Sequence, residues 1–375
     1  MRAVCTIVNF DYLSQANVLF SSLKDTNKDL NYFVLVLDGK GNSQELIAGV
    51  ITIYPGQLDL DSSSFQEMCE YYDVIELATS LKPFVLNFLL NLGFSSVIYL
   101  DPDIQVFSSL ENVFKNTENS GTTLTPHRLT PTRGSNPGFH ELGFLRYGTY
   151  NLGFIGVTKN STDMLDWWSR RLVRYSGKFP EEHIFTDQKW MDLARAYFDL
   201  TVIRERTLNI APWNLDERPL HYLNGILMCP DGPVVFIHFS QLSSSLSKGI
   251  FLPYWEDTLI DSREHEVSLE IISGLSRSYS ELLINAKNEF TDSYKSELKP
   301  LFKSSLLRKA LRERYLQTDT DHVFKKTNQL LSLINKWPND KILNALERSF
   351  FFRHAVYGLG IDFKRFKTKV RKHWK

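Results

Sequence analysis

Three nearly continuous apolar runs, each interrupted by polar residues toward its end, constrain the fold more than any other feature of this sequence. They cover residues 3–10, 32–38 and 95–107; the second ends in Asp38, and the third carries Asp101 and Asp103. Strands that read as unbroken apolar runs are buried on both faces, as in parallel sheets with helical crossovers. Helical spacing of apolar residues follows the first run and precedes the third. This alternation predicts an α/β fold whose sites lie at the carboxyl ends of strands.

The middle of the chain continues this alternation around one irregular segment. We expect strands at residues 150–157 and 233–239, and helices at 163–175 and 188–196. Residues 126–147 are polar and rich in turn-forming residues, and their Thr-Pro-Thr-Arg-Gly-Ser-Asn-Pro core does not suit regular structure. A loop of this length inside a compact domain is typical of a functional lid or of a disordered excursion.

The last third of the chain has a different texture, with helical spacing, few glycines and no convincing strand. We therefore predict a catalytic domain over residues 1–260 and an all-helical extension over 261–375. The extension ends in a basic run, residues 364–375, where Lys and Arg alternate with Phe366, Val370 and Trp374. Such a run suits either peripheral contact with an anionic membrane or a solvated tail.

Composition argues against some classes of protein and predicts where in the cell the protein lies. The formal net charge is zero, which does not suggest a nucleic-acid partner. Three cysteines at wide spacings give neither a disulfide framework nor a metal pattern. The start lacks a signal-peptide pattern, and no apolar stretch is predicted to span a bilayer. These features predict a cytoplasmic protein, peripheral at the inner face of the membrane if the basic tail binds there.

The sharpest chemical feature is Tyr99-Leu100-Asp101-Pro102-Asp103. A buried strand that ends here delivers two carboxylates into one turn. Two such oxygen ligands can hold Mg²⁺ or Mn²⁺, which can bind a diphosphate. Asp-Pro-Asp is also a good turn sequence, so the motif alone does not decide between a metal site and a turn.

Three further positions lie where they could join this pair. His238 comes near the end of an apolar strand and suits either a metal ligand or a structural histidine. Asp187 and Gln188 stand at a helix start, where Thr186 or Asp187 could cap the helix or where the pair could bind sugar hydroxyls. Asn151 is a polar residue inside an apolar strand and needs a partner if it is buried.

The order of these pieces resembles the GT-A fold glycosyltransferases, within them family 8, the group of glycogenin and bacterial lipopolysaccharide galactosyltransferases. The resemblance covers roughly the first 255 residues. It implies a Rossmann-like mixed sheet flanked by helices. It also implies that Asp101, Asp103 and His238 bind Mn²⁺ or Mg²⁺, since they match the Asp-x-Asp pair and the C-terminal metal ligand of that family.

The resemblance also implies residues that contact the donor. Asn9 and Tyr12 match the nucleotide-binding start and would lie against the base. Asn151 matches the Asn of an Asn-x-Gly strand that touches the donor sugar or the acceptor. Asp187 and Gln188 match a catalytic pair beside the anomeric carbon.

Two family features are altered here. The family has a Gly and a Lys after its metal-binding His to hold the diphosphate; this sequence continues His238-Phe239-Ser240-Gln241, and Lys248 is the substitute we expect. Lys82 is our replacement for an Arg on the helix before the Asp-x-Asp strand. The segment at residues 209–218, Asn-Ile-Ala-Pro-Trp-Asn-Leu-Asp-Glu-Arg, resembles a stretch in bacterial relatives and is expected to shape the donor or acceptor pocket.

The function implied is a metal-dependent hexosyltransferase that moves a sugar from a nucleotide donor, in the first place a UDP-sugar. The acceptor would be a glycan or a lipid-linked acceptor in bacterial surface polysaccharide synthesis. No residue stands out as a general base, which suits retaining transfer. The alternative is a degenerate nucleotide-sugar-binding module that scaffolds a cell-surface glycan assembly, and the altered Gly and Lys positions favour that alternative.

Overall fold

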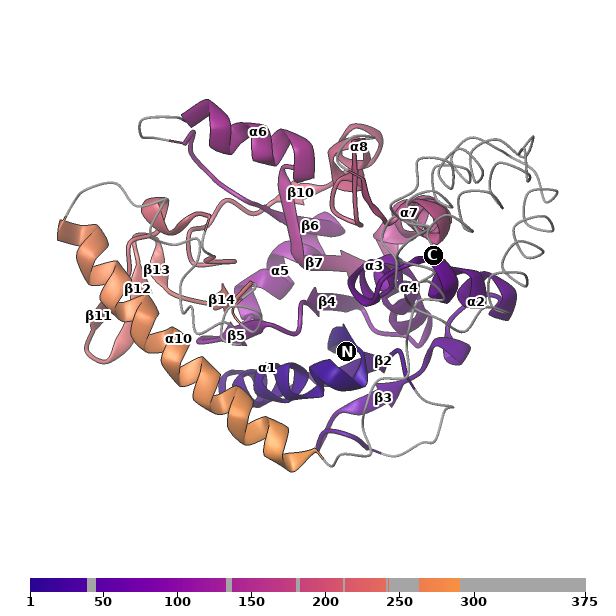
Figure 1. Ribbon diagram of the computed structural model, residues 1–375, viewed down its shortest axis with the longest axis horizontal. Coiled ribbons are helices and arrows are strands. Elements are labelled where there is room, and N and C mark those ends of the chain that lie inside the picture. Colours follow the sequence, from indigo (N-terminus) through magenta and orange to yellow (C-terminus); the bar gives the residue numbers. More distant parts are fainter. Residues whose placement is uncertain are drawn as a thin grey trace, which may run out of the picture. The chain divides into compact units, whose positions relative to one another are not determined.

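The computed structural model describes residues 1–38, 45–132, 137–179, 183–211, 213–240, 242 and 263–290 (Figure 1). The chain divides into two compact units. The first contains Met1–Phe65 and Val74–Leu298, and the second contains Gln66–Asp73 with Lys299–Lys375. Of the second unit only residues 66–73 are described, within or next to helix α2 (Ser62–Tyr71). Everything that follows concerns the first unit.

A seven-stranded sheet forms the centre of this unit, in the order β10-β6-β7-β4-β1-β2-β3. Strand β1 pairs in parallel with β2 and β4, and β7 runs antiparallel between β4 and β6. The predicted α/β fold with a mixed sheet flanked by helices is therefore confirmed. The strands are β1 (Arg2–Val8), β2 (Asn31–Val36), β3 (Ile51–Ile53), β4 (Ser96–Leu100), β6 (Thr122–Pro126), β7 (Tyr150–Thr158) and β10 (Thr201–Val202).

The sheet follows from the apolar runs in the sequence. All residues of β4 are buried, and so are all those of β1 except Arg2, because helices cover both faces of these central strands. The described α-helices of this unit are α1 (Leu13–Thr26), α3 (Val74–Ser80), α4 (Lys82–Asn91), α5 (Glu111–Ser120), α6 (Pro137–Tyr147), α7 (Thr162–Tyr175), α8 (Trp190–Tyr197) and α10 (Arg263–Glu289).

Short strands outside the main sheet bring distant parts of the chain together near the carboxyl end of β4. Strand β5 (Ile104–Val106) pairs antiparallel with β14 (Phe236–His238). The predicted strand at 233–239 is therefore broken, since its first part lies in β13. The remaining strands are β8 (Lys178–Phe179), β9 (Ile184–Phe185), β11 (His221–Leu223), β12 (Ile226–Cys229) and β13 (Gly232–Pro233).

Helix α10 is the described part of the predicted helical extension, and it belongs to the first unit. It runs along α1 (Figure 1), where Asn17 Nδ2 donates to Glu289 Oε2 over 2.7 Å. Ile272 and Tyr279 of α10 join a buried apolar cluster with Val18 of α1 and Phe239 beyond β14. The division at residue 260 stays a prediction, and residues 291–375, which include the basic tail, lie outside the described residues.

The prediction of an irregular segment at 126–147 is wrong for its second half, which forms helix α6. Proline fits the first turn of a helix, where its missing N–H has no partner to lose, so Pro137 begins α6 rather than preventing it. The turn-rich residues 133–136 lie outside the described residues.

One stretch, Val74–Asn91, is long and apolar enough to cross a membrane by length and composition alone. Our expectation that no such stretch exists was wrong on that criterion. However, the stretch is divided between α3 and α4, 56% of it is buried inside the molecule, and it contains the buried charged residues Glu76 and Lys82. It therefore forms two helices of the core.

Gly93, with φ of 100°, ends α4 in the conformation that favours glycine.

Candidate metal and donor site

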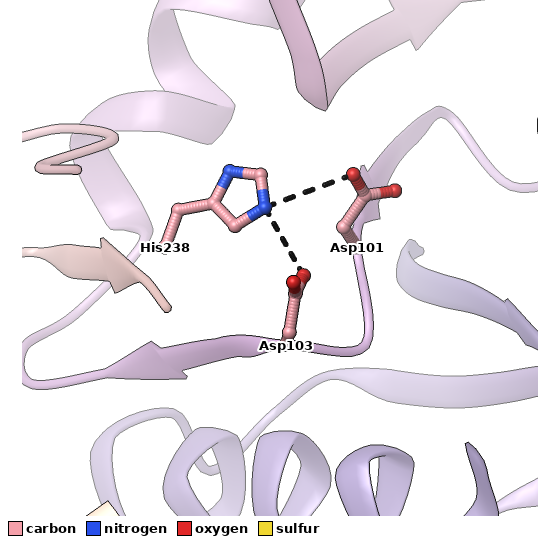
Figure 2. A group of neighbouring side chains, drawn as sticks. All are labelled: Asp101, Asp103 and His238. Atoms are coloured by element: carbon pink, nitrogen blue, oxygen red, sulfur yellow. Dashed lines mark ion pairs between the residues drawn. The ribbon is translucent and has the colours of Figure 1, made fainter. Parts of the chain in front are cut away.

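Asp101, Asp103 and His238 meet where β4 ends (Figure 2). The two aspartates flank the turn from β4 into β5, and the pairing of β5 with β14 sets His238 opposite Ile104. His238 Nε2 lies 3.1 Å from Asp103 Oδ1 and 3.9 Å from Asp101 Oδ2. The three side chains each offer one ligand atom, and these atoms lie within 4.8 Å of one another. The structure therefore brings the three predicted residues together, and that they bind a metal ion stays a prediction.

The charges of this group stabilise one another against burial. Burial lowers the pKa of His238, but the Asp103 and Asp101 carboxylates together outweigh burial and raise the pKa above its ordinary value. For Asp103, burial raises the pKa, but the charge and hydrogen bond of His238, with the charge of Lys82, together outweigh burial and lower the pKa. A positive charge at this position is thus favoured by the surrounding protein. A proton on His238 or a bound cation supplies such a charge.

A divalent cation fits the same set of donors. Two carboxylates and one imidazole match the ligands that Mn²⁺ and Mg²⁺ accept in proteins. The Asp101 and Asp103 side chains are 24% and 27% exposed, so both carboxylates reach solvent and a ligand, whereas the His238 side chain is 5% exposed. A cation bound to His238 Nε2 would take the place of the proton.

Lys82 links the metal pair to Asp187. Its Nζ lies 3.2 Å from Asp101 Oδ1 and 2.9 Å from Asp187 Oδ2, and it donates to the Leu152 carbonyl over 2.7 Å. Burial lowers the pKa of Lys82, but the two carboxylates outweigh it and raise the pKa. Tyr99, whose ring lies under Lys82 Nζ, donates its hydroxyl to Asp101 Oδ1 over 2.7 Å. Lys82 therefore fixes Asp101 and Asp187 relative to each other.

Asp187 and Gln188 are oriented differently. Asp187 is buried and faces Lys82, and its main-chain carbonyl accepts from Trp168 Nε1 over 3.2 Å. Gln188 turns away, and its Nε2 donates to the Tyr147 carbonyl at the end of α6 over 2.9 Å. Neither Thr186 nor Asp187 caps the following helix, because the residue at the N-cap of α8 is Lys189. The capping alternative was therefore wrong.

Asn151 finds the partners that its burial requires. Its Oδ1 accepts from the Gly153 N–H over 3.0 Å and from Asn209 Nδ2 over 2.9 Å, and its Nδ2 lies 3.4 Å from His127 Nε2. Burial lowers the pKa of His127 to about 4, so its ring is neutral near pH 7 and can accept from Asn151. Asn151 thus stands in a network directly beside the metal group.

The expected nucleotide-binding start lies at the end of β1. Asn9 is buried, and its Nδ2 donates to Asp11 Oδ2 over 3.2 Å. The Phe10 N–H donates to Asp38 Oδ2 over 2.6 Å, which joins the ends of β1 and β2. Tyr12 stands at the start of α1 and packs against the core. That Asn9 and Tyr12 bind a base stays a prediction, and Lys248 lies outside the described residues.

The segment at residues 209–218 contributes more to the site than its sequence indicated. Asn209 has φ of 55° and donates to Asn151 and to Thr125 Oγ1, each over 2.9 Å. Trp213 stands against the His238 ring at 5.7 Å between centroids. Asp216 binds Arg128 through two contacts of 2.5 and 2.7 Å. The resemblance to bacterial relatives singled out the segment, but these roles depend on contacts with residues far away in the chain.

Comparison with known proteins gives distant relatives. No protein-family model matches the chain. The uncharacterized protein YfnF of Bacillus subtilis is 27% identical over 246 residues, 64% of this chain and 80% of YfnF. The uncharacterized protein YfnD of the same organism is 22% identical over 245 residues, 63% of this chain and 76% of YfnD.

Several solved structures have a similar fold. The galactosyltransferase LgtC, in complex with donor and acceptor sugar analogs, is 13% identical, covers 76% of this chain and 96% of LgtC, and has a TM-score of 0.44. The glycosyltransferase GlyE of Streptococcus pneumoniae is 15% identical and covers 81% of this chain and 66% of GlyE, with a TM-score of 0.41. Mouse xyloside xylosyltransferase 1 is 13% identical and covers 64% of this chain and 97% of its own, with a TM-score of 0.40. These likenesses concern the fold alone.

Proposed function

We propose that the protein is a metal-dependent glycosyltransferase that takes a hexose from a nucleotide donor, a UDP-sugar in the first place. The observation that carries the proposal is the group of Asp101, Asp103 and His238 at the end of β4, with Lys82 and Asp187 directly behind it. A site of this kind suits a substrate that has a diphosphate beside a sugar.

The charges of the site support binding of a cation and then of a diphosphate. With His238 neutral, Lys82 offsets one carboxylate among Asp101, Asp103 and Asp187, and net negative charge stays on the exposed aspartates. Asp101 and Asp103 with His238 would hold Mn²⁺ or Mg²⁺. Bound there, the cation supplies Lewis acid stabilisation of the charge that develops on a departing nucleoside diphosphate.

The protein's own residues would orient the sugar. Lys82 fixes Asp187 at a set place relative to the metal ligands, and fixed polar groups are what orient a reacting centre without reorganisation. Gln188 would reach the sugar only after release from the Tyr147 carbonyl, so we assign the direct contact to Asp187 first. Asn151 offers its amide beside the same centre.

The finer parts of the proposal rest on the family resemblance. They are retention of configuration, donor contacts by Asn9, Tyr12 and Lys248, an acceptor that is a glycan or is lipid-linked, and a place in bacterial surface polysaccharide synthesis. A cytoplasmic enzyme with its basic tail, residues 364–375, against the membrane would meet such an acceptor.

Turnover of the donor tests the proposal. Purified protein with Mn²⁺ and a panel of UDP-hexoses should release UDP, in slow hydrolysis without an acceptor and faster with one. The Asp101→Ala variant should lose most of this activity. Full activity in Asp101→Ala would refute the assignment. Binding of a UDP-hexose and Mn²⁺ without any turnover would support the alternative, a nucleotide-sugar-binding module that acts as a scaffold.

A further inference from the structure

Among the described residues, the imidazole of His238 finds no hydrogen bond of the kind that usually orients a metal ligand. Its Nε2 faces the aspartates, and its Nδ1 is buried with no hydrogen-bond partner among the described residues. Metal-binding histidines generally donate their second N–H to a carboxylate, a carbonyl or a water molecule, which fixes the ring. Within the described part of the chain, the ring of His238 is held by the packing around it.

Gly153 of β7 forms one part of that shape. A Cβ atom on this residue would lie 2.7 Å from both Cε1 and Nδ1 of His238 and 2.8 Å from Asn151 Oδ1. Real Cβ atoms essentially never approach so closely, so only glycine leaves room for the ring here. The main chain of Gly153 is itself fixed, because its carbonyl accepts from the Asp101 N–H over 2.8 Å.

Trp213 forms another part. Its ring lies 5.7 Å from the His238 ring between centroids, at an interplanar angle of 87°. Edge-to-face contacts of this geometry are favourable and directional. The Trp213 main chain is held in turn, because Arg128 Nη1 donates to the Trp213 carbonyl over 2.8 Å while the same guanidinium binds Asp216.

We propose that Gly153 and Trp213 are positioning residues that hold the His238 imidazole, by shape and ring contact, with Nε2 toward Asp101 and Asp103. This inference rests on the proposed metal site and gives the segment at 209–218 a role in it. The Arg128–Asp216 pair acts one step further out, by fixing Trp213. Nothing in it depends on which sugar or acceptor the protein uses.

Affinity for Mn²⁺ alone, measured by electron paramagnetic resonance on the full chain, tests the inference without turnover. Gly153→Ala and Trp213→Ala should each weaken Mn²⁺ binding by about 10- to 100-fold, the range found when second-layer contacts are lost. Trp213→Phe keeps an aromatic ring and should stay within about 3-fold of the wild type. His238→Ala gives the reference for loss of the ligand itself.

Two matched controls separate positioning from general damage. Gly156 lies in the same strand, and a Cβ there would collide with the hydroxyls of Thr117 and Thr123, away from the metal group. Trp167 of α7 is likewise a partly buried tryptophan, packed against Trp190 and Tyr197. Gly156→Ala and Trp167→Ala should lower the melting temperature and leave Mn²⁺ affinity as in the wild type.

The outcomes are separable. Wild-type affinity in folded Gly153→Ala and Trp213→Ala would overturn the inference, and so would equal losses in the two controls. If Gly153→Ala does not fold, the comparison of Trp213→Ala with Trp213→Phe still decides. Wild-type protein that binds Mn²⁺ no better than His238→Ala would overturn the proposed metal site itself, and the inference with it.

Discussion

Replacement of Lys82 by methionine should cost this protein a large part of its stability. The Lys82 and Asp187 side chains are 2% and 3% exposed and lie 2.9 Å apart, and Lys82 also donates to the Leu152 carbonyl. Removal of one partner from a buried ion pair leaves the other charge without compensation, at a cost of about 3–5 kcal/mol. Burial already raises the pKa of Asp187, and Lys82 works against that rise.

Urea unfolding of Lys82→Met, Asp187→Leu and the double variant measures this cost. We expect Lys82→Met to lose about 3–5 kcal/mol, and the double variant to recover about half or more because no isolated charge stays buried. Lys189→Met is the matched control, since the Lys189–Asp192 pair is 20% and 24% exposed, and it should cost about 1 kcal/mol or less.

The pH dependence gives a second readout of the same reasoning. A carboxyl whose pKa is higher in the folded than in the unfolded state destabilises the folded state least at low pH, where it is protonated in both states. Without Lys82 the pKa of Asp187 should rise further, so the loss in Lys82→Met should be smaller near about pH 5 than near about pH 8. A loss below about 1 kcal/mol at neutral pH, or a double variant no more stable than Lys82→Met, would refute the reasoning.

Three further changes have expected outcomes that urea unfolding checks. Burial lowers the pKa of His127 in the folded state to about 4 from the ordinary 6.5. The neutral ring therefore contributes its full share to the free energy of unfolding above about pH 6.5, and up to about 3 kcal/mol of it is lost as the pH falls toward about 4. His127→Gln should remove this part of the pH dependence, and an unchanged slope would count against it. Asn209 has φ of 55°, so Asn209→Ala should be less stable than Asn209→Gly by about 1 kcal/mol, whereas equal stabilities would argue against strain at this position. The Arg128 and Asp216 side chains are each 7% exposed, so Asp216→Asn should cost about 3 kcal/mol, and a loss under about 1 kcal/mol would show that the pair does not hold the segment.

Much of the fold could be predicted because its signals are local. The runs at β1, β2 and β4 are apolar on both faces, and the helices α7 and α8 follow the spacing of their apolar residues. Helix α6 was missed because turn-forming residues precede it, and they hid a helix that begins at Pro137 itself. The break between β13 and β14 depends on pairing with separate partners, which the run at 233–239 does not encode.

The site, like the fold, has parts that the sequence predicts and parts that only the folded chain brings together. Asp101, Asp103 and His238 could be predicted, since each ends or follows an apolar strand and a family pattern orders them. Lys82 was named only as the replacement for a family Arg, and the sequence could not show that it joins Asp101 to Asp187. Gly153 of β7 and Trp213 of a later loop both contact His238 of β14, so these contacts join segments far apart in the chain and only the folded structure contains them.

Thermal unfolding with UDP and Mn²⁺, each alone and together, tests most directly whether Asp101, Asp103 and His238 hold a cation on a nucleoside diphosphate. A ligand that binds only the folded state raises the free energy of unfolding, and with it the melting temperature. The gain is about 2.7 kcal/mol when the ligand is present at about 100 times its dissociation constant. We predict that UDP with Mn²⁺ stabilises the wild type more than the sum of the two alone, and that Asp103→Ala loses this excess. Stabilisation by UDP that does not depend on Mn²⁺, or that is undiminished in Asp103→Ala, would contradict the account.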